Sequence, residues 1–157
     1  MQQKEIKFLF QQFESVKELS RDDRKLLEEA IAASAAAYAR YSKFKVGAAI
    51  LLENGVIVKG SNQENAAYPS GLCAERVAAF AAASGYPGIK FRSIAVAAFL
   101  NENKEPHPAG PCGNCRQVLA EYELLYGSPI RVIMIGEERK IIIADNTASL
   151  LPFLFKG

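Results

Sequence analysis

The stretch VGAAILLENGVIVKG, residues 46–60, decides how this chain folds. Two apolar runs in it flank Asn54 and Gly55, and an Asn-Gly pair between such runs is the strongest short-range signal for a β-hairpin. We therefore expect one strand at residues 46–52 and a second strand at residues 56–60, joined by a tight turn.

Helices and strands alternate on both sides of this hairpin. On the N-terminal side, DDRKLLEEAIAASAAAY (residues 22–38) is a run of good helix formers, and Ser20 is suited to be its N-cap. On the C-terminal side the sequence predicts a helix from Cys73, a strand from Ser93, a loop at 101–111, a helix from Cys112, and strands at 130–136 and 140–145. This order is typical of one layered α/β domain.

The chain divides into a short N-terminal extension and one domain. Its 157 residues fit a single domain. We place that domain at residues 20–157, and we interpret residues 1–19 as an extension that is either a helix or a pairing segment at a subunit edge. The alanine-rich helices indicate close packing, either on the sheet or between subunits.

Composition and charge exclude several classes of protein. The formal net charge is +2, and no clustered basic patch indicates a nucleic-acid partner. The apolar burst at residues 8–10 is too short for a secretory signal, and no run approaches the roughly 20 apolar residues of a membrane span. We therefore expect a cytoplasmic protein without a nucleic-acid or membrane partner.

Three cysteines carry the strongest chemical signal. Their number is odd, which argues against a closed disulfide framework, and clustered cysteines in a reducing compartment serve metal binding or catalysis. Cys112 and Cys115 form a C-x-x-C pair that can bind one ion through two sulfurs, and Cys73 supplies a third. Because three ligands leave one position open, the pattern predicts one catalytic zinc ion per chain.

Charged neighbours of these cysteines indicate how such a site would work. Glu75 follows Cys73 by two residues, so it can move protons for a zinc-activated water without binding the metal. A Cys-Ala-Glu that precedes Pro-Cys-x-x-Cys is the signature of zinc deaminases as a class. Three thiolates outweigh the charge of Zn²⁺, and Arg76 and Arg116 are the candidates to offset that excess by donating to a sulfur.

Other interpretations of the cysteines stay open at this point. A C-x-x-C pair can be redox-active, although redox sites of the thioredoxin type are not preceded by Cys-Ala-Glu. The zinc could be structural, with His107 as its fourth ligand, or the chain could be a non-catalytic zinc module that binds other molecules. A structural zinc leaves Glu75 and the residues near Asn62 unexplained, and a non-catalytic module explains the cysteines alone.

Four segments together resemble the small homotetrameric cytidine deaminases. They are YSKFKVGAAI (41–50), GSNQENAAYPSGLCAER (60–76), PCGNCRQVL (111–119) and LLPFLF (150–155). The resemblance extends over nearly all of residues 22–155. It implies a three-layer fold, in which a central five-stranded mixed sheet is flanked by helices.

The resemblance also implies a reaction and its partners. The reaction is the hydrolytic deamination of cytidine, and of deoxycytidine, to uridine or deoxyuridine and ammonia, in pyrimidine salvage. A zinc-activated hydroxide attacks C4 of the base, and Glu75 carries protons to N3 and to the leaving ammonia. The partners are a small nucleoside substrate and further copies of the chain in a homotetramer with shared active sites.

Substrate contacts of the family carry over to matching positions of this sequence. Phe44 would line the pyrimidine pocket, and the backbone at Ala74 would hold the edge of the base. Asn62 and Glu64 would hydrogen-bond the ribose. The segments that reach into a neighbouring subunit's site match three further residues: Ala66, Tyr68 and Phe155.

Departures from the family pattern leave the zinc ligands and Glu75 untouched. Arg40 stands where the family has Pro, Ala67 replaces a small Ser or Cys, and Gly110 replaces a Ser. Deaminases of blasticidin-type antibiotics share the zinc motif but should lack the ribose pair, which is present here. Deaminases that edit nucleic acids should show a basic groove or added strand-binding loops.

Overall fold

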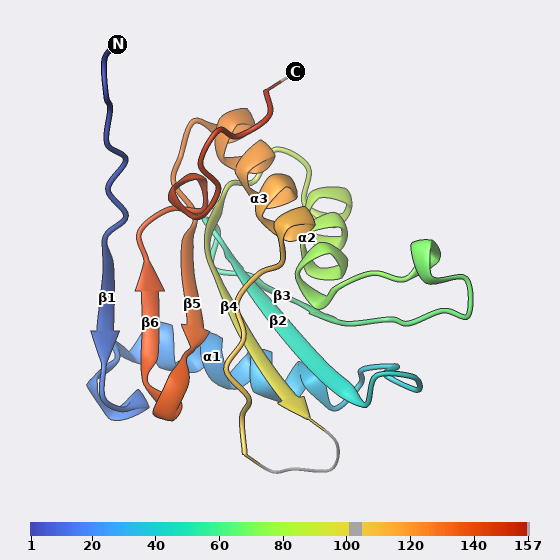
Figure 1. Cartoon of the computed structure of the whole chain (residues 1–157). Helices are drawn as coiled ribbons and strands as arrows, with labels where there is room; N and C mark the ends of the chain where they lie inside the picture. The colour runs from blue at the N-terminus through green and yellow to red at the C-terminus, as the bar shows by residue number, and fades with distance from the viewer. Residues whose placement is uncertain (101–104, 157) are drawn as a thin grey trace.

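A mixed β-sheet forms the middle layer of the protein (Figure 1). The computed structural model describes residues 1–100 and 105–156, and within them the sheet has six strands in the order β1-β6-β5-β4-β2-β3. β4 and β5 run parallel, and the other neighbouring pairs are antiparallel. The strands are β1 (Phe10–Phe13), β2 (Phe44–Leu52), β3 (Ile57–Ser61), β4 (Phe91–Leu100), β5 (Arg131–Ile135) and β6 (Ile141–Ala144).

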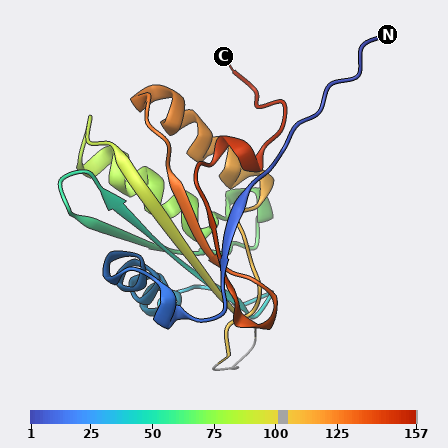
Figure 2. The ribbon, with the colours of Figure 1, turned by 90° about the vertical axis from the view of Figure 1, so that its left-hand side faces the viewer.

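Helices cover both faces of this sheet (Figures 1 and 2). In the described ranges the α-helices are α1 (Arg21–Ser34), α2 (Ala74–Gly85) and α3 (Gly113–Tyr126), and the 3₁₀-helices are η1 (Val16–Glu18), η2 (Tyr68–Ser70), η3 (Glu137–Arg139) and η4 (Ala148–Leu150). On one face Leu26 of α1 shares an apolar cluster with Ile133. On the other face Ala78 of α2 and Leu119 of α3 share a cluster with Ile94. The predicted three-layer α/β fold is therefore confirmed.

The predicted hairpin is present and its turn is where the Asn-Gly pair indicated. The Asn54 side-chain oxygen accepts a hydrogen bond from the Val56 backbone N–H at 3.1 Å. Gly55 has φ of +84°, a conformation that glycine adopts without steric cost. The strand before the turn begins at Phe44, two residues earlier than predicted, because β2 pairs with β4 as far as Leu100.

Two glycines let helices approach the sheet at backbone distance. A Cβ at Gly47 would collide with α1, and a Cβ at Gly60 would collide with the Ala78 nitrogen and the Ala74 carbonyl of α2. The first turns of α2 therefore lie directly on β3. This close approach determines where Cys73, the residue before α2, is placed in the molecule.

Helix α1 begins as predicted and ends earlier than predicted. The Ser20 hydroxyl accepts a hydrogen bond from the Asp23 backbone N–H at 3.1 Å, which confirms Ser20 as the N-cap. The helix ends at Ser34 and not at Tyr38. The reason is tertiary: the Tyr38 backbone pairs with the segment after β3, donating to the Asn62 carbonyl at 3.0 Å and accepting from the Glu64 N–H at 2.9 Å.

The N-terminal extension supplies one strand more than the five expected. β1 pairs antiparallel with β6 along the edge of the sheet, and Phe13 packs against the apolar cluster on the α1 side. Without β1, the backbone groups on this edge of β6 would have no partner in the sheet. Within residues 1–19 the structure therefore shows a pairing strand at Phe10–Phe13, on the chain's own sheet, and a short 3₁₀-helix at Val16–Glu18.

The remaining elements follow the predicted order. β4 starts at Phe91, two residues before Ser93, and α3 starts immediately after Cys112. Of the loop expected at 101–111, residues 101–104 lie outside the described residues. Across the described ranges, the helices are all too short or too polar to cross a membrane.

Candidate metal centre

The three cysteines meet at the adjacent N-termini of two helices. Cys73 is the N-cap residue of α2 and Cys112 is the N-cap residue of α3, both with extended backbone and without a side-chain capping bond. Cys115 lies in the first turn of α3 and is buried. Free N–H groups and the positive end of the helix dipole favour thiolates at such positions.

The spacing of the sulfurs fits a tetrahedral zinc ion. The Cys73 and Cys112 sulfurs are 3.8 Å apart, and the Cys112 and Cys115 sulfurs are 3.5 Å apart. All three lie within 4.8 Å of one another. Zinc bound tetrahedrally at about 2.3 Å from each sulfur would separate the sulfurs by about 3.8 Å. The donor set and its geometry therefore suit one zinc ion.

His107 is placed apart from this group. Among the described His, Cys, Asp and Glu side chains, the cluster that could hold a metal contains only Cys73, Cys112 and Cys115. The imidazole of His107 instead meets the ring of Phe44 edge-on, with centroids 5.5 Å apart. The alternative of a structural zinc with His107 as fourth ligand is therefore wrong.

Electrostatics at the sulfurs favour negative charge on Cys73. A hydrogen bond from the Cys115 thiol, together with Arg76, lowers the pKa of Cys73 to about 5. The same hydrogen bond and burial raise the pKa of Cys115. Arg76 donates to the Cys73 sulfur at 3.9 Å, and its Nε is buried without a hydrogen-bond partner in the described chain. This unpaired donor fits a site built to hold several thiolates.

Glu75 lies beside the sulfurs, in the first turn of α2. Its side chain is 4% exposed, and it lines the same cleft as Cys73 and Cys112. Burial, with a contribution from the Cys73 charge, raises the pKa of Glu75 to about 7. A carboxyl group with a pKa near neutrality can both accept and release a proton, as a general acid–base requires.

Arg116 lies elsewhere than predicted. Its Nε donates to the Pro111 carbonyl at 2.7 Å and its Nη1 donates to the Leu150 carbonyl at 2.9 Å. Over the residues that the structure describes, only Arg76 among the arginines makes a hydrogen bond to a cysteine sulfur. The expectation that both arginines donate to sulfur is therefore corrected for Arg116, because backbone carbonyls take up its guanidinium.

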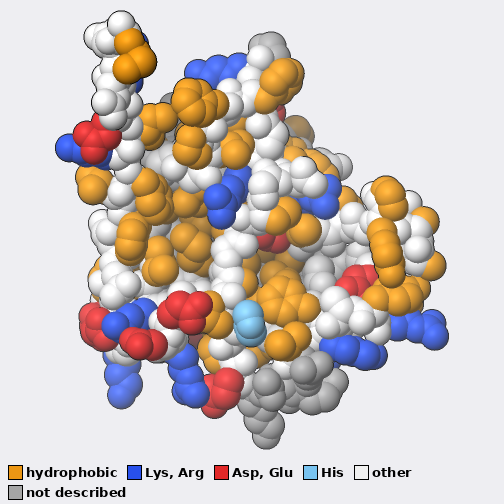
Figure 3. Space-filling model, in the orientation of Figure 1, with side chains coloured by type: hydrophobic (Ala, Val, Ile, Leu, Met, Phe, Trp, Pro, Cys, Tyr) orange, Lys and Arg blue, Asp and Glu red, His pale blue; other side chains and the backbone are white. Residues whose placement is uncertain are grey.

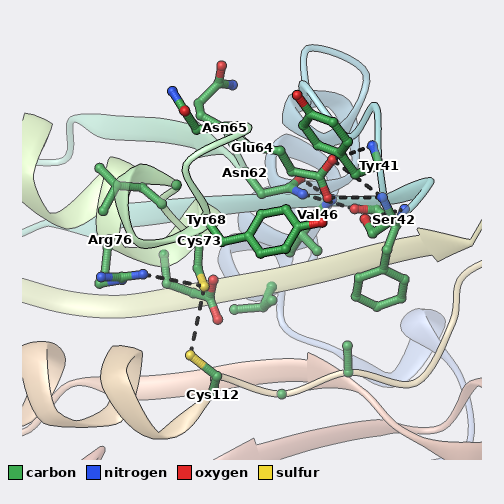
Figure 4. A pocket seen from close by; sticks show the side chains of 18 residues that line it. Tyr41, Ser42, Val46, Asn62, Glu64, Asn65, Tyr68, Cys73, Arg76 and Cys112 are labelled. Atoms are coloured by element: carbon green, nitrogen blue, oxygen red, sulfur yellow. Dashed lines mark hydrogen bonds between the residues drawn. The ribbon is translucent and has the colours of Figure 1, made fainter.

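A cleft of about 670 Å³ opens over the metal centre. Figure 3 shows a hollow on this face, bordered by hydrophobic side chains and with acidic side chains in and beside it. In Figure 4, Cys73 and Cys112 lie on one side, with Asn62, Glu64 and Tyr41 across the space from them. The cleft therefore combines a metal-binding end with a polar end.

The polar end is held by hydrogen bonds to backbone. The Asn62 side chain accepts from the Val46 N–H at 2.7 Å and donates to the Phe44 carbonyl at 2.9 Å. The Glu64 carboxylate accepts from the Tyr41 N–H at 2.7 Å and from the Ser42 N–H at 3.3 Å. A hydrogen bond from the Ser42 side chain, followed by the backbone bond from Tyr41, lowers the pKa of Glu64. A carboxylate has about four acceptor sites, so Glu64 can still bind a hydroxyl group.

The predicted substrate-binding residues divide into two groups. Phe44, Asn62, Glu64 and Tyr68 line the cleft. Three others do not line it in the single chain: Ala66, which is exposed, Ala74, which is fully buried, and Phe155, whose side chain is 74% exposed.

Sequence reasoning missed several residues of the cleft. Tyr41 and Ser42 hold Glu64 through their N–H groups, and their signal was available in the YSKFKV motif. Val96 of β4 and Ala109 form part of the wall. Ala109 lies two residues before Pro111 of the second cysteine motif, whereas Val96 lies on a strand distant from the motifs, so no local pattern indicates it.

Comparisons with known proteins converge on one kind of enzyme. A family model described as "Cytidine and deoxycytidylate deaminase zinc-binding region" matches residues 20–125. Cytidine deaminase of Halalkalibacterium halodurans is 45% identical over 100 residues, which are 64% of this chain and 71% of that protein. Cytidine deaminase of Sporosarcina psychrophila is 47% identical over 102 residues, 64% of this chain and 70% of that protein.

Solved structures are similar over a larger part of the chain. The crystal structure of cytidine deaminase from Burkholderia pseudomallei is 40% identical to this chain, with a TM-score of 0.70. The match covers 87% of this chain and 100% of that chain. The part of the present chain that has no counterpart in that structure is therefore small.

Proposed function

The chain belongs to the cytidine and deoxycytidylate deaminase family, and from this premise we propose that it is a zinc-dependent cytidine deaminase. It hydrolyses cytidine, and deoxycytidine, to the corresponding uridine and ammonia, a reaction of pyrimidine salvage. The observation that carries this proposal is a three-sulfur group beside the buried Glu75, with Cys73, Cys112 and Glu75 lining one cleft. An acid–base carboxyl has no use in a non-catalytic zinc module.

Cys73, Cys112 and Cys115 hold the single zinc ion. Zinc at a site with an open position acts as a Lewis acid and makes water a nucleophile near neutral pH. Arg76 offsets part of the negative charge of the thiolates by donating to the Cys73 sulfur.

Glu75 moves protons between the attacking water and the base. Addition of water at C4 releases one proton, and N3 of the ring takes one up. The amino nitrogen then gains a proton from the added hydroxyl group and leaves as ammonia, so C4 ends as a carbonyl. The Glu75 carboxyl serves both transfers, and burial raises its pKa to about 7.

The walls of the cleft orient the nucleoside. Phe44 offers an aromatic face for the pyrimidine, and Asn62 and Glu64 offer polar groups for the ribose hydroxyls. The Ala74 backbone, between Cys73 and Glu75 that line the cleft, is assigned to the edge of the base by resemblance to the family. Because Asn62 and Glu64 are themselves fixed by backbone N–H groups, they present their remaining acceptors in a defined direction.

The finer organisation also belongs to the proposal. We assign the deaminase domain to residues 20–157, with residues 1–19 as an extension, a division supported by the family match that starts at residue 20. The protein is cytoplasmic and forms a homotetramer with shared sites. The shared sites are supported by Tyr68 and Phe155, which match the family's intersubunit segments. Their side chains are 77% and 74% exposed in the single chain.

Ammonia release from cytidine tests the proposed function. Zinc-loaded protein should contain one zinc ion per chain and release ammonia and uridine in equal amounts. Cys112→Ala should lose metal and turnover together, because the site then keeps two sulfurs. A protein that retains one zinc per chain and releases no ammonia would favour the non-catalytic module instead.

A further inference from the structure

One face of α3 holds the end of the chain. Arg116 and Glu123 are seven residues apart, about two helical turns, so they project from the same side of the helix. Both contact the segment that follows β6, which we call the C-terminal segment (residues 147–155). Arg116 donates to the Leu150 carbonyl, and Glu123 accepts from the Thr147 N–H at 2.6 Å and the Ala148 N–H at 2.8 Å.

The two anchors differ in their distance from the metal centre. Glu123 lies toward the far end of α3, where its carboxylate also accepts from the Ile130 N–H at 2.6 Å. Arg116 lies next to Cys115, and its second hydrogen bond goes to the Pro111 carbonyl, the group directly before Cys112. The Arg116 guanidinium therefore links the Leu150 carbonyl of the C-terminal segment to the Pro111 carbonyl, which directly precedes Cys112. Arg116 itself directly follows Cys115.

The C-terminal segment is held by its backbone, while its aromatic side chains are free. Gln117 donates to the Phe155 carbonyl at 3.1 Å, next to the Arg116 bond on the same helix. The side chains of Phe153 and Phe155 are nevertheless 94% and 74% exposed. The contacts thus fix the direction of the segment and leave its aromatic rings available to another surface.

We infer that Arg116 is a positioning residue that couples the sulfur ligands to the C-terminal segment at Leu150. When Cys112 and Cys115 are held together, the Pro111 carbonyl is fixed and the planar guanidinium sets the position of the Leu150 carbonyl. A rigid fork with two acceptors at set positions transmits displacement in a way that a lysine cannot. This inference rests on the proposed zinc site.

Hydrogen exchange of the backbone amides tests the coupling. The Leu150 and Leu151 N–H groups bond within η4, whereas those of Thr147 and Ala148 bond to Glu123. Removing zinc from the wild-type protein should speed exchange at Leu150 and Leu151 by about tenfold, the scale of one charge-assisted hydrogen bond. Exchange at Thr147 and Ala148 should stay within about twofold and is the internal control.

Two matched variants separate the two arginines. In zinc-loaded Arg116→Lys, the Leu150 and Leu151 amides should exchange as fast as they do in zinc-free wild type. Removing zinc from this variant by chelation should then raise their exchange rates little further. Arg76→Lys should shift the thiolate absorption of the Co²⁺-substituted protein, because Arg76 contacts the Cys73 sulfur, and should leave exchange at Leu150 as in wild type.

Three results would overturn the coupling. In the first, the exchange rate of the Leu150 amide in the wild-type protein does not change when zinc is removed. In the second, the exchange rates of all four amides rise together. In the third, the exchange rate at Leu150 in Arg116→Lys still changes when zinc is removed. The wild-type comparison decides alone if Arg116→Lys does not fold. Since the readout is exchange and not turnover, a protein that shows the coupling and releases no ammonia from cytidine would contradict only the proposed function.

Discussion

Arg76 and Arg116 stand next to the two cysteine motifs, yet their guanidinium groups have different partners. Arg76 donates to the Cys73 sulfur, whereas Arg116 donates to two backbone carbonyls. The first can offset thiolate charge directly, and the second acts on the position of the chain. At this scale the chemistry of the site depends on single hydrogen bonds that adjacency in the sequence does not specify.

Glu75→Gln should retain zinc and the fold and lose turnover. An amide cannot shuttle protons, and a general acid–base group contributes about 10²–10⁴-fold to the rate. We expect kcat with cytidine to fall by at least about a hundredfold while the zinc content stays at one per chain. The matched control is Glu121→Gln, an exposed glutamate of α3, which should behave as wild type. Near-normal kcat in Glu75→Gln would remove Glu75 from the mechanism.

Glu64 should make the enzyme select free nucleosides. If its carboxylate accepts the ribose 3′-hydroxyl, a 3′-phosphate would meet it as a like charge. Solvent screens part of this repulsion, so we expect kcat/KM for cytidine 3′-monophosphate, or for a short single strand, to be at least about tenfold below that for cytidine.

Glu64→Gln should narrow the difference in kcat/KM between cytidine and cytidine 3′-monophosphate. The control is Glu53→Gln, which changes an exposed residue of the hairpin and should leave that difference as in wild type. Because Glu64 also holds the Tyr41 and Ser42 N–H groups, the unfolding free energy of the variant must be measured alongside. Efficient deamination of the 3′-phosphate by wild type, or an unchanged ratio in Glu64→Gln, would return Glu64 to a purely structural role.

At the scale of elements, the metal centre depends on how two helices begin. Both N-cap positions are cysteines, and α2 is pressed onto β3 through Gly60. The absence of a Cβ at Gly60 lets the α2 backbone lie directly against β3, closer than any other residue would allow. The packing of α2 on β3 therefore sets the backbone position of Cys73, the residue before the helix.

Gly60→Ala should destabilise the protein and weaken zinc binding together. The added Cβ collides with α2 backbone, and overpacking of this kind costs about 1–3 kcal/mol in the free energy of unfolding. Urea unfolding and zinc titration measure the two effects. Gly85→Ala is the control within α2, since a Cβ there meets nothing within 4 Å, and it should lose neither stability nor zinc. A fully stable, zinc-replete Gly60→Ala would contradict this account.

At the scale of the whole molecule, the cleft is built from segments far apart in the chain. Its lining includes Phe44 of β2, Glu75 of α2 and Val96 of β4. The C-terminal segment ends with Phe155 largely exposed, outside the cleft of its own chain. This arrangement suits a site completed by a neighbouring copy.

Truncation after Pro152 should raise KM for cytidine more than it lowers kcat. The loss removes Phe155, whose ring would close a neighbour's pocket, and leaves the sulfur ligands and Glu75 in place. A chain that ends at Phe155 is the matched control and should keep the wild-type KM. Light scattering of the intact protein should give four times the mass of one chain, and a fully active monomer would refute the shared site.

The sequence alone determined the features that depend on neighbouring residues. The Asn-Gly turn, the Ser20 cap, the order of elements from α1 onward, and the helices that begin directly after Cys73 and Cys112 all follow from local conformational preferences. The ligand set could be predicted for the same reason: spacing within two short motifs limits how the sulfurs can be arranged, and their chemistry admits few metals.

Only the tertiary structure decided the features that depend on contacts between distant segments. Alanine-rich sequence predicted that α1 continues to Tyr38, but pairing of the Tyr38 backbone with the segment after β3 ends the helix at Ser34. His107 could have been a zinc ligand and packs on Phe44 instead. The sixth strand, and the Arg116 bond to a carbonyl 34 residues away, have the same origin. Such contacts form when the sheet brings the segments together, so the conformational propensities of neighbouring residues cannot predict them.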